Sequence, residues 1–280
     1  MGRSRNFLVL TKPRVVLMVL VTTSVGFYLG SEGPPHWIRL LSTLLGTALA
    51  AAGTIALNQY LEREVDAWME RTRRRPLPQG RLRPAEALWF GVAITAAGIL
   101  LLLAVGPLPS LLTAATVGLY LFAYTPLKRK SPLCLIVGAV PGALPPLIGW
   151  VAARAEFGIG AGVLFGILFL WQLPHTLAIA RLYREDYARG GIRLLPANRA
   201  AAEAQALAGC LGLLVVGTLP TLIGLTGQVY LFGALMLGVG LLGCGVLDAL
   251  WPSLGAARRL LFASLLYLPT LLVLMTLDKS

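Results

Sequence analysis

The sequence has few charged side chains, and this scarcity excludes an ordinary soluble domain. Only 13% of the 280 residues are Asp, Glu, Lys or Arg, whereas 57% are hydrophobic and the mean hydropathy is +0.77. Soluble domains carry about 25% charged residues. The composition therefore predicts an integral membrane protein.

Paired cysteines and a leader cleavage motif are also missing. Cys134, Cys210 and Cys244 are odd in number and far apart in the chain, so we expect neither a disulfide framework nor a Cys-x-x-Cys metal site. No small-residue cleavage site follows the first apolar run. We therefore expect that run to remain as a membrane span.

Apolar runs long enough to cross a bilayer, which takes about 20 helical residues, recur along the whole chain. They predict an all-α polytopic protein with one integral-membrane domain over residues 1–280. Polar loops follow in a similar order in two parts of the chain, about 15–130 and 132–250, and suggest a degenerate four-helix repeat. The nine expected spans are about 15–31, 38–60, 86–105, 108–125, 132–152, 157–177, 203–225, 229–249 and 260–277.

The basic residues are concentrated at the N-terminus and in every second loop. Of the 24 Lys and Arg residues, 21 lie before the first span or in alternate loops, and only Arg39, Arg154 and Lys279 lie in the others. Lys and Arg accumulate on the cytoplasmic side of membrane proteins. The pattern predicts a cytoplasmic N-terminus and a C-terminus outside, and we expect the protein to be a multi-pass protein of the prokaryotic cell (inner) membrane.

A polar motif begins where the second span ends. Asn58, Glu62 and Asp66 are four residues apart, so on a continuous helix they share one face. Mg²⁺ prefers one or two carboxylates together with phosphate oxygens. We therefore predict Asn58, Glu62 and Asp66 as catalytic metal ligands, with Arg71 and Arg75 as diphosphate-binding residues.

A solvated helix end with charge pairs one turn apart is the alternative interpretation of this motif. Two features disfavour it. The carboxylates stand at the membrane rim, where burying them is costly without a partner, and the arginines exceed what orientation requires.

Further candidates for diphosphate binding stand at the end of the fourth span and just before the first span. Tyr124, Lys128 and Arg129 could bind phosphate oxygens, although an interfacial Tyr with orienting cations explains this stretch equally well. Lys12 is a weaker candidate, because an anchor at the water interface explains it better.

A second acidic station follows the sixth span. Glu185 and Asp186 precede the Gly190–Gly191 pair, as acid and base precede the turn in the first motif. Two facing stations could place two Mg²⁺ ions on one diphosphate. Adjacent residues share a helix face poorly, so we expect one acid, Asp186, to bind metal and the other to pair with an arginine.

Aromatic and polar residues of the fifth and sixth spans are candidates for a substrate pocket. The Pro- and Gly-rich stretch that ends at Trp150 predicts a kinked helix beside a cavity. Trp171 and Gln172 could line that cavity. His175 could ligate haem iron, although a lone histidine at a span end is more often hydrogen-bonded locally.

These motifs together resemble the UbiA superfamily of membrane prenyltransferases. The stretches that carry the resemblance are Leu10–Arg14, Asn58–Asp66, Met69, Arg71–Thr72, Arg75–Pro78, Tyr124–Arg129, Pro145–Trp150, Trp171–His175 and Asp186–Gly191. The Pro145–Trp150 and Trp171–His175 stretches resemble the haem-modifying branch of that superfamily.

The resemblance implies nine helices around a central cavity, with cytoplasmic loops as a cap. It implies Mg²⁺-dependent transfer of farnesyl from farnesyl diphosphate to a vinyl group of haem b, which gives haem O and diphosphate. Membrane lipid and haem-handling or oxidase-assembly proteins are the partners that it suggests, and no nucleic acid is expected. One departure is that Tyr183 and Tyr187 stand where the superfamily's second motif usually has aspartates, which weakens the expectation of a second metal.

Two alternatives stay open at this point. The first is prenylation of an aromatic quinone precursor such as 4-hydroxybenzoate by the same kind of enzyme. The second is an ion-coupled transporter, since helices broken by Gly and Pro also build transport sites. Transporters usually place ionisable residues near mid-membrane, whereas the acids here gather at the rim.

Overall fold

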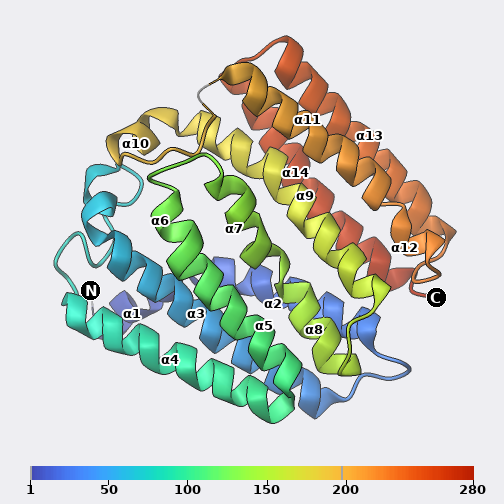
Figure 1. Cartoon of the computed structure of the whole chain (residues 1–280), viewed down its shortest axis with the longest axis horizontal. Helices are drawn as coiled ribbons and strands as arrows, with labels where there is room; N and C mark the ends of the chain where they lie inside the picture. Colours follow the sequence, from blue (N-terminus) through green and yellow to red (C-terminus); the bar gives the residue numbers. More distant parts are fainter. Residues whose placement is uncertain (1, 197) are drawn as a thin grey trace.

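Long helices joined by short turns make up nearly all of the computed structural model, which describes residues 2–196 and 198–280 (Figure 1). Among these residues the one extended pairing is an isolated bridge between Thr226 and Lys279. The helical elements are α1 (Arg3–Thr11), α2 (Pro13–Gly30), α3 (Trp37–Trp68), α4 (Pro84–Val105), α5 (Pro107–Gly118), the π-helical η1 (Leu119–Tyr124), α6 (Thr125–Leu127), α7 (Cys134–Ala143), α8 (Pro145–Arg154), α9 (Ile159–Leu182), α10 (Arg184–Arg189), α11 (Arg199–Val216), α12 (Leu219–Leu222), α13 (Gln228–Leu250) and α14 (Leu254–Leu277).

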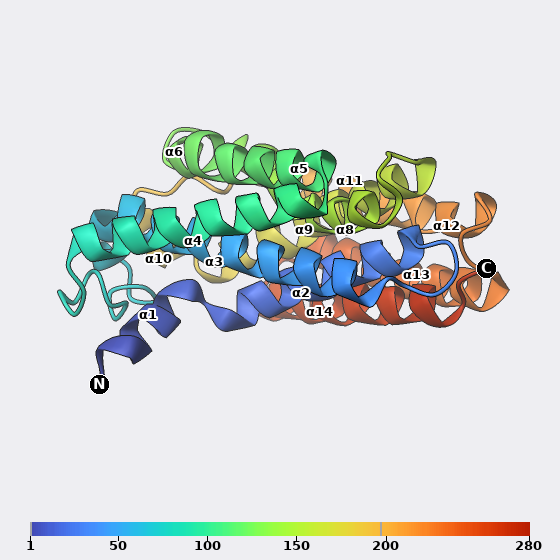
Figure 2. The same cartoon turned by 90° about the horizontal axis from the view of Figure 1, so that it is seen from below.

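The prediction of an all-α protein with nine membrane spans is confirmed. The part of the chain that the structure describes has nine helical segments long and apolar enough to cross a bilayer. Each overlaps one expected span, although the second span ends eight residues later than expected and the ninth begins six residues earlier. The two termini lie at opposite ends of the bundle (Figures 1 and 2). The chain is thus a multi-pass membrane protein.

A short helix that the hydropathy pattern did not predict precedes the first span. α1 ends at Thr11, and the next residue, Lys12, has a left-handed φ of +47° that turns the chain before Pro13 begins α2. Proline fits there because the first turn of a helix leaves its N–H groups unpaired.

Glycines allow neighbouring spans to pack closely. A Cβ atom on Gly53 of α3 would lie 2.1 Å from Oγ1 of Thr95 in α4. One on Gly149 of α8 would lie 2.0 Å from the carbonyl oxygen of Thr23 in α2. Small residues at such contacts let helix backbones approach in a membrane, where van der Waals packing drives association.

Two spans are irregular in the middle of the bundle. The predicted kink of the fifth span is confirmed, because α7 ends at Ala143 and α8 begins at Pro145. The fourth span widens into the π-helical turn η1, after which the N–H of Thr125 bonds the carbonyl of Tyr120. Such π-bulges are frequent at functional sites.

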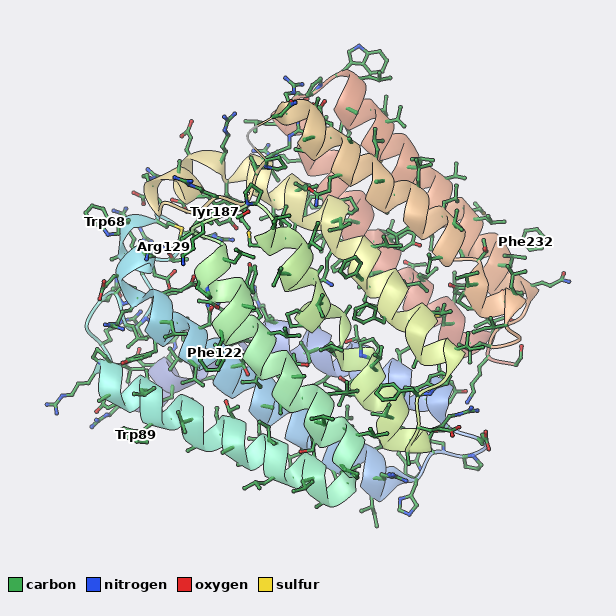
Figure 3. All side chains as sticks on the ribbon, in the orientation of Figure 1. Trp68, Trp89, Phe122, Arg129, Tyr187 and Phe232 are labelled. Carbon is green, nitrogen blue, oxygen red and sulfur yellow. The ribbon has the colours of Figure 1, made fainter. Side chains whose placement is uncertain are left out.

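Apolar side chains cover the outside of the bundle. Trp89, Phe122 and Phe232 are between 64% and 78% exposed and lie on the outer surface of the helices (Figure 3). Lipid would cover such a surface. Trp68, Arg129 and Tyr187 lie at the same end of the bundle, where α3 ends and α10 lies, which we call the polar end (Figure 3).

Candidate active site

Three oxygen-bearing side chains of α3 share one face at the polar end. Because α3 continues unbroken to Trp68, Asn58, Glu62 and Asp66 lie one turn apart, as predicted. All three are buried, and they line one polar pocket of about 140 Å³, which we call the head pocket.

Cations neutralise both carboxylates of the head pocket. Asp66 accepts a hydrogen bond of 2.5 Å from Arg75, and Glu62 forms an ion pair with Lys128. The Asn58 amide donates to Glu62 over 2.8 Å. A buried carboxylate needs such partners, because removing an unpaired charge from water is costly.

Thr125 belongs to this network and was not among the predicted residues. Its hydroxyl donates over 2.8 Å to Oδ1 of Asn58 and also lies 2.8 Å from the carbonyl oxygen of Tyr120 in η1. The contact with Asn58 joins the fourth span to α3. In the sequence only its place between Tyr124 and Lys128 could have drawn attention to Thr125.

Most of the predicted diphosphate-binding residues line the head pocket. Those present are Lys12, Arg71, Arg75, Tyr124 and Lys128, together with Tyr120 and Tyr187, whereas Arg129 is exposed and lies outside the lining. Burial lowers the pKa of Lys12 to about 8, with a further contribution from Arg75, while Asp66 acts in the opposite direction. Because four basic side chains and only two carboxylates line the pocket, it has an excess of positive charge that suits a diphosphate.

The second acidic station lies outside the head pocket. Glu185 and Asp186 line a neighbouring surface cleft with Glu70. Asp186 accepts hydrogen bonds from the backbone N–H groups of Glu70 (2.7 Å) and Arg71 (3.3 Å) and from the side chain of Arg189 (2.9 Å). Partial burial raises the pKa of Asp186, but these hydrogen bonds outweigh it and hold the pKa below its usual value. Asp186 thus fixes the turn after α3.

The two tyrosines of the second station hold Arg71. Its guanidinium carbon lies 5.2 Å from the ring centres of both Tyr183 and Tyr187, and its Nη2 donates to the Tyr187 hydroxyl over 3.0 Å. Cation–π contacts of this kind attract an arginine to a ring face. In this station, then, tyrosines orient a cation of the head pocket.

A largely apolar cavity of about 270 Å³ lies beside the head pocket, among the spans. Tyr120 and Tyr124 line both spaces, so they form the junction. Gln172 lines this central cavity, as predicted, and donates to the carbonyls of Ala139 and Leu168. The other walls come from α2, α3, α5, α7 and α8 and include Val19, Thr47, Ala51, Val117, Leu135, Gly142 and Ile148.

The structure does not place the other predicted substrate-pocket residues in this cavity. The Trp171 indole donates to the carbonyl of Ser264 in α14 over 2.7 Å. Nδ1 of His175 lies 2.9 Å from the Ser264 hydroxyl. The rings of Trp171 and His175 stack with their centres 4.5 Å apart. Trp150 is buried in the core under Arg154. The local hydrogen bond of His175 agrees with the alternative weighed from the sequence.

The oxygen donors of the head pocket suit Mg²⁺. Among the described residues no three His, Cys, Asp or Glu side chains cluster in a way that could hold a metal by themselves. Asn58, Glu62 and Asp66 offer two carboxylates and one amide oxygen instead. Mg²⁺ is usually bound by such a small set and completed by phosphate oxygens and water.

Known sequences resemble this chain over nearly its whole length. The model of the UbiA prenyltransferase family matches residues 19–268. A protoheme IX farnesyltransferase of Solibacter usitatus is 45% identical, with 98% of this chain and 99% of the relative covered. One from Aquifex aeolicus is 39% identical, with 98% and 95% covered.

Solved structures share the fold. A structure described as digeranylgeranylglyceryl phosphate synthase superposes with a TM-score of 0.86 at 16% identity and covers 99% of both chains. A UbiA homologue from Archaeoglobus fulgidus, bound to GPP and Mg²⁺, superposes with a TM-score of 0.68 at 15% identity and covers 96% of this chain and 99% of its own.

Proposed function

The chain belongs to the UbiA prenyltransferase family, and we propose that it transfers a farnesyl group from farnesyl diphosphate to a vinyl group of haem b. The products are haem O and diphosphate. Full-length relatives that carry the name protoheme IX farnesyltransferase support this choice of substrates.

One observation carries the proposal. A small cationic pocket lies beside a larger and mostly apolar cavity, and Tyr120 and Tyr124 line both. A prenyl diphosphate has the same division into a charged head and an apolar tail. The head pocket would therefore bind the diphosphate and the central cavity the isoprenoid chain.

The basic side chains assist departure of the diphosphate. Lys12, Arg71 and Arg75 line the head pocket with Lys128, and each can bond a phosphate oxygen. Preorganised cations that meet developing negative charge are worth far more in a water-excluded site than in water. To reach the substrate, Arg75 and Lys128 exchange their carboxylate partners for phosphate oxygens.

Asn58, Glu62 and Asp66 would hold Mg²⁺. When bound, the ion neutralises charge on the diphosphate and makes it a better leaving group. The exchange of partners by Arg75 and Lys128 frees Asp66 and Glu62 for this role.

The central cavity protects the carbon skeleton during the reaction. The C–O bond to diphosphate breaks and leaves an allylic cation, which apolar walls shield from water. The electron pair of the haem vinyl group then forms the new C–C bond. Water adds to the resulting cation beside the porphyrin and loses a proton, which leaves a hydroxyethylfarnesyl substituent. No protein nucleophile takes part.

We also propose that the polar end faces the cytoplasm of a prokaryotic cell and that the C-terminus lies outside. The sorting of 21 of the 24 basic residues supports this orientation. The substrates would then reach the head pocket from the cytoplasmic side or laterally from the membrane.

One assay tests the function. Purified protein in detergent is incubated with haem b, farnesyl diphosphate and Mg²⁺, with and without EDTA, and the haem product is identified by mass. Metal-dependent farnesylated haem is the expected result. Prenylation of 4-hydroxybenzoate without any haem product would keep the diphosphate pocket and overturn the haem assignment.

A further inference from the structure

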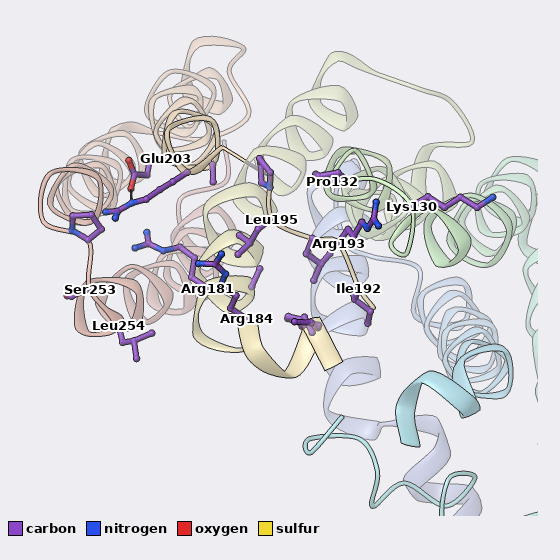
Figure 4. Close-up of a pocket in the computed structure, with 18 residues that line it drawn as sticks. Lys130, Pro132, Arg181, Arg184, Ile192, Arg193, Leu195, Glu203, Ser253 and Leu254 are labelled. Atoms are coloured by element: carbon purple, nitrogen blue, oxygen red, sulfur yellow. Dashed lines mark hydrogen bonds and ion pairs between the residues drawn. The ribbon is translucent and has the colours of Figure 1, made fainter. Parts of the chain in front are cut away.

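A second large pocket opens at the polar end beside the head pocket. This rim pocket has a volume of about 730 Å³ and lies between the end of α9, α10, the segment 191–196 and the starts of α11 and α14 (Figure 4). We propose that it binds the acceptor haem, with its two propionates on the cationic rim. This inference rests on the function proposed above.

The lining has the chemical division of a porphyrin. Pro132, Ile192, Leu194, Leu195 and Leu254 provide apolar surface for the macrocycle. Five basic residues stand on the same lining: Lys130, Arg181, Arg184, Arg193 and Arg199. Guanidinium groups bind carboxylates through two parallel hydrogen bonds, so propionates match this rim.

Two of the arginines on the rim are free to bind an external anion. Arg181 pairs with Asp248, and Arg199 pairs with Glu203 over 2.7 Å. Neither Arg184 nor Arg193 has a carboxylate oxygen within 4 Å among residues 2–196 and 198–280. Figure 4 shows their side chains on the two sides of Leu195. Two unpaired guanidinium groups correspond to two propionates.

The rim pocket adjoins the reaction centre. Tyr187, Ile192 and Leu194 line both the rim pocket and the head pocket, so they form a common wall. The backbone N–H of Arg193 donates to the carbonyl of Lys128 over 2.7 Å, which ties this wall to a lysine of the head pocket. A macrocycle anchored by its propionates would direct its other edge, which carries vinyl groups, toward this wall, and the wall residues would have to move for a vinyl group to reach the allylic carbon.

The central cavity is a poorer place for the acceptor. It holds about 270 Å³, compared with about 730 Å³ for the rim pocket. Its apolar space is already assigned to the isoprenoid chain. Unpaired cations are absent from its lining among the described residues, so propionates buried there would lack partners.

The test uses Arg184→Gln/Arg193→Gln in the full-length protein and compares haem b with its dimethyl ester, in which both propionates are neutral. With haem b the double variant should raise the KM for haem about tenfold and leave the KM for farnesyl diphosphate unchanged, because charge-assisted hydrogen bonds to carboxylates are lost. With the dimethyl ester, wild type and variant should have the same KM. Arg259→Gln is the matched control, an exposed cation of α14 that lines no described pocket.

A Soret titration without farnesyl diphosphate measures haem binding separately from turnover and should show the same tenfold difference. An unchanged KM for haem b in an active double variant would overturn the rim site while the proposed function stands. An equal loss with haem b and the ester would also overturn it, because the arginines would then act on lipid headgroups or on the fold. If wild type makes no farnesylated haem but the titration still shows propionate-dependent binding, the function fails and the site stands.

Discussion

Arg75 donates a hydrogen bond of 2.5 Å to Asp66, whose side chain is almost fully buried nine residues earlier in the chain. This contact folds the turn after α3 back over the end of the helix. It also keeps the Arg75 guanidinium beside the Asp66 carboxylate in the protein without substrate. The pair therefore links the fold of the polar end to its chemistry, and it allows the roles of the acids to be separated by mutation.

Asp66→Asn should lower kcat/KM by about 100-fold, because the change removes a charged side chain that we propose as a Mg²⁺ ligand and leaves Arg75 without a counter-charge. The Mg²⁺ concentration at half-maximal rate should rise as well. The rate of haem product formation, followed by mass during a Mg²⁺ titration, measures both effects.

Glu64→Gln is the matched control for this change. Glu64 lies on the same helix, and its side chain is 82% exposed and lines no described pocket. Its activity should match wild type. Wild-type activity in Asp66→Asn itself would remove Asp66 from the metal site.

Asp186→Asn should behave differently from Asp66→Asn. Asp186 holds the backbone of Glu70 and Arg71, so its loss should loosen the turn that presents Arg71. We expect the KM for farnesyl diphosphate to rise about fivefold while the Mg²⁺ dependence stays that of wild type. A shifted Mg²⁺ dependence would instead support the prediction from the sequence that Asp186 binds metal.

Sequence alone predicts those features that depend on local order. Nine apolar runs specify nine spans because each must satisfy its backbone hydrogen bonds within the membrane. The spacing of Asn58, Glu62 and Asp66 specifies one face because helix geometry is fixed once the helix continues. The break before Pro145 follows from proline chemistry in the same way.

Features that depend on how one helix faces another are not predictable in this way. Trp171 and His175 have the residue types of a substrate pocket, but their helix turns them toward Ser264. Thr125 is an unremarked hydroxyl in the sequence, and the π-helical turn before it aims it at Asn58. The orientation of α9 and α6 in the bundle decides both cases.

Thr125→Val tests the contact that the sequence did not predict. Valine keeps the volume of threonine but cannot donate to Asn58, so the Asn58 amide loses the partner that orients it. A lost hydrogen bond of about 1 kcal/mol corresponds to a fall in kcat/KM of roughly fivefold. Thr22→Val, which removes a hydroxyl that bonds only within its own helix, should keep wild-type activity. Equal effects in both variants would argue for loss of stability.

Binding of the prenyl diphosphate should weaken above a pH of about 8. The pKa of Lys12 is about 8 in the free protein, and the anion raises it by favouring the protonated amine. Binding thus takes up a proton above that pH, and Kd rises up to tenfold per pH unit. Lys12→Arg stays charged and should bind without this dependence. Calorimetry with an unreactive analogue of farnesyl diphosphate measures Kd, and identical pH profiles for both proteins would exclude Lys12 as the titrating group.

The far end of the central cavity should set the length of the isoprenoid. Thr47 lines the cavity eleven residues before Asn58, which places it about 16 Å along the helix axis from Asn58. Its hydroxyl has no hydrogen-bond partner among the described residues, so an apolar replacement sacrifices no bond. Thr47→Phe should fill this end and raise the preference for geranyl over farnesyl diphosphate at least tenfold in kcat/KM. Leu45→Phe, on the same helix but 56% exposed and outside the cavity, should keep the wild-type preference. An unchanged preference in an active Thr47→Phe protein would mean that the chain lies elsewhere, and the assignment of this cavity to the isoprenoid would be wrong.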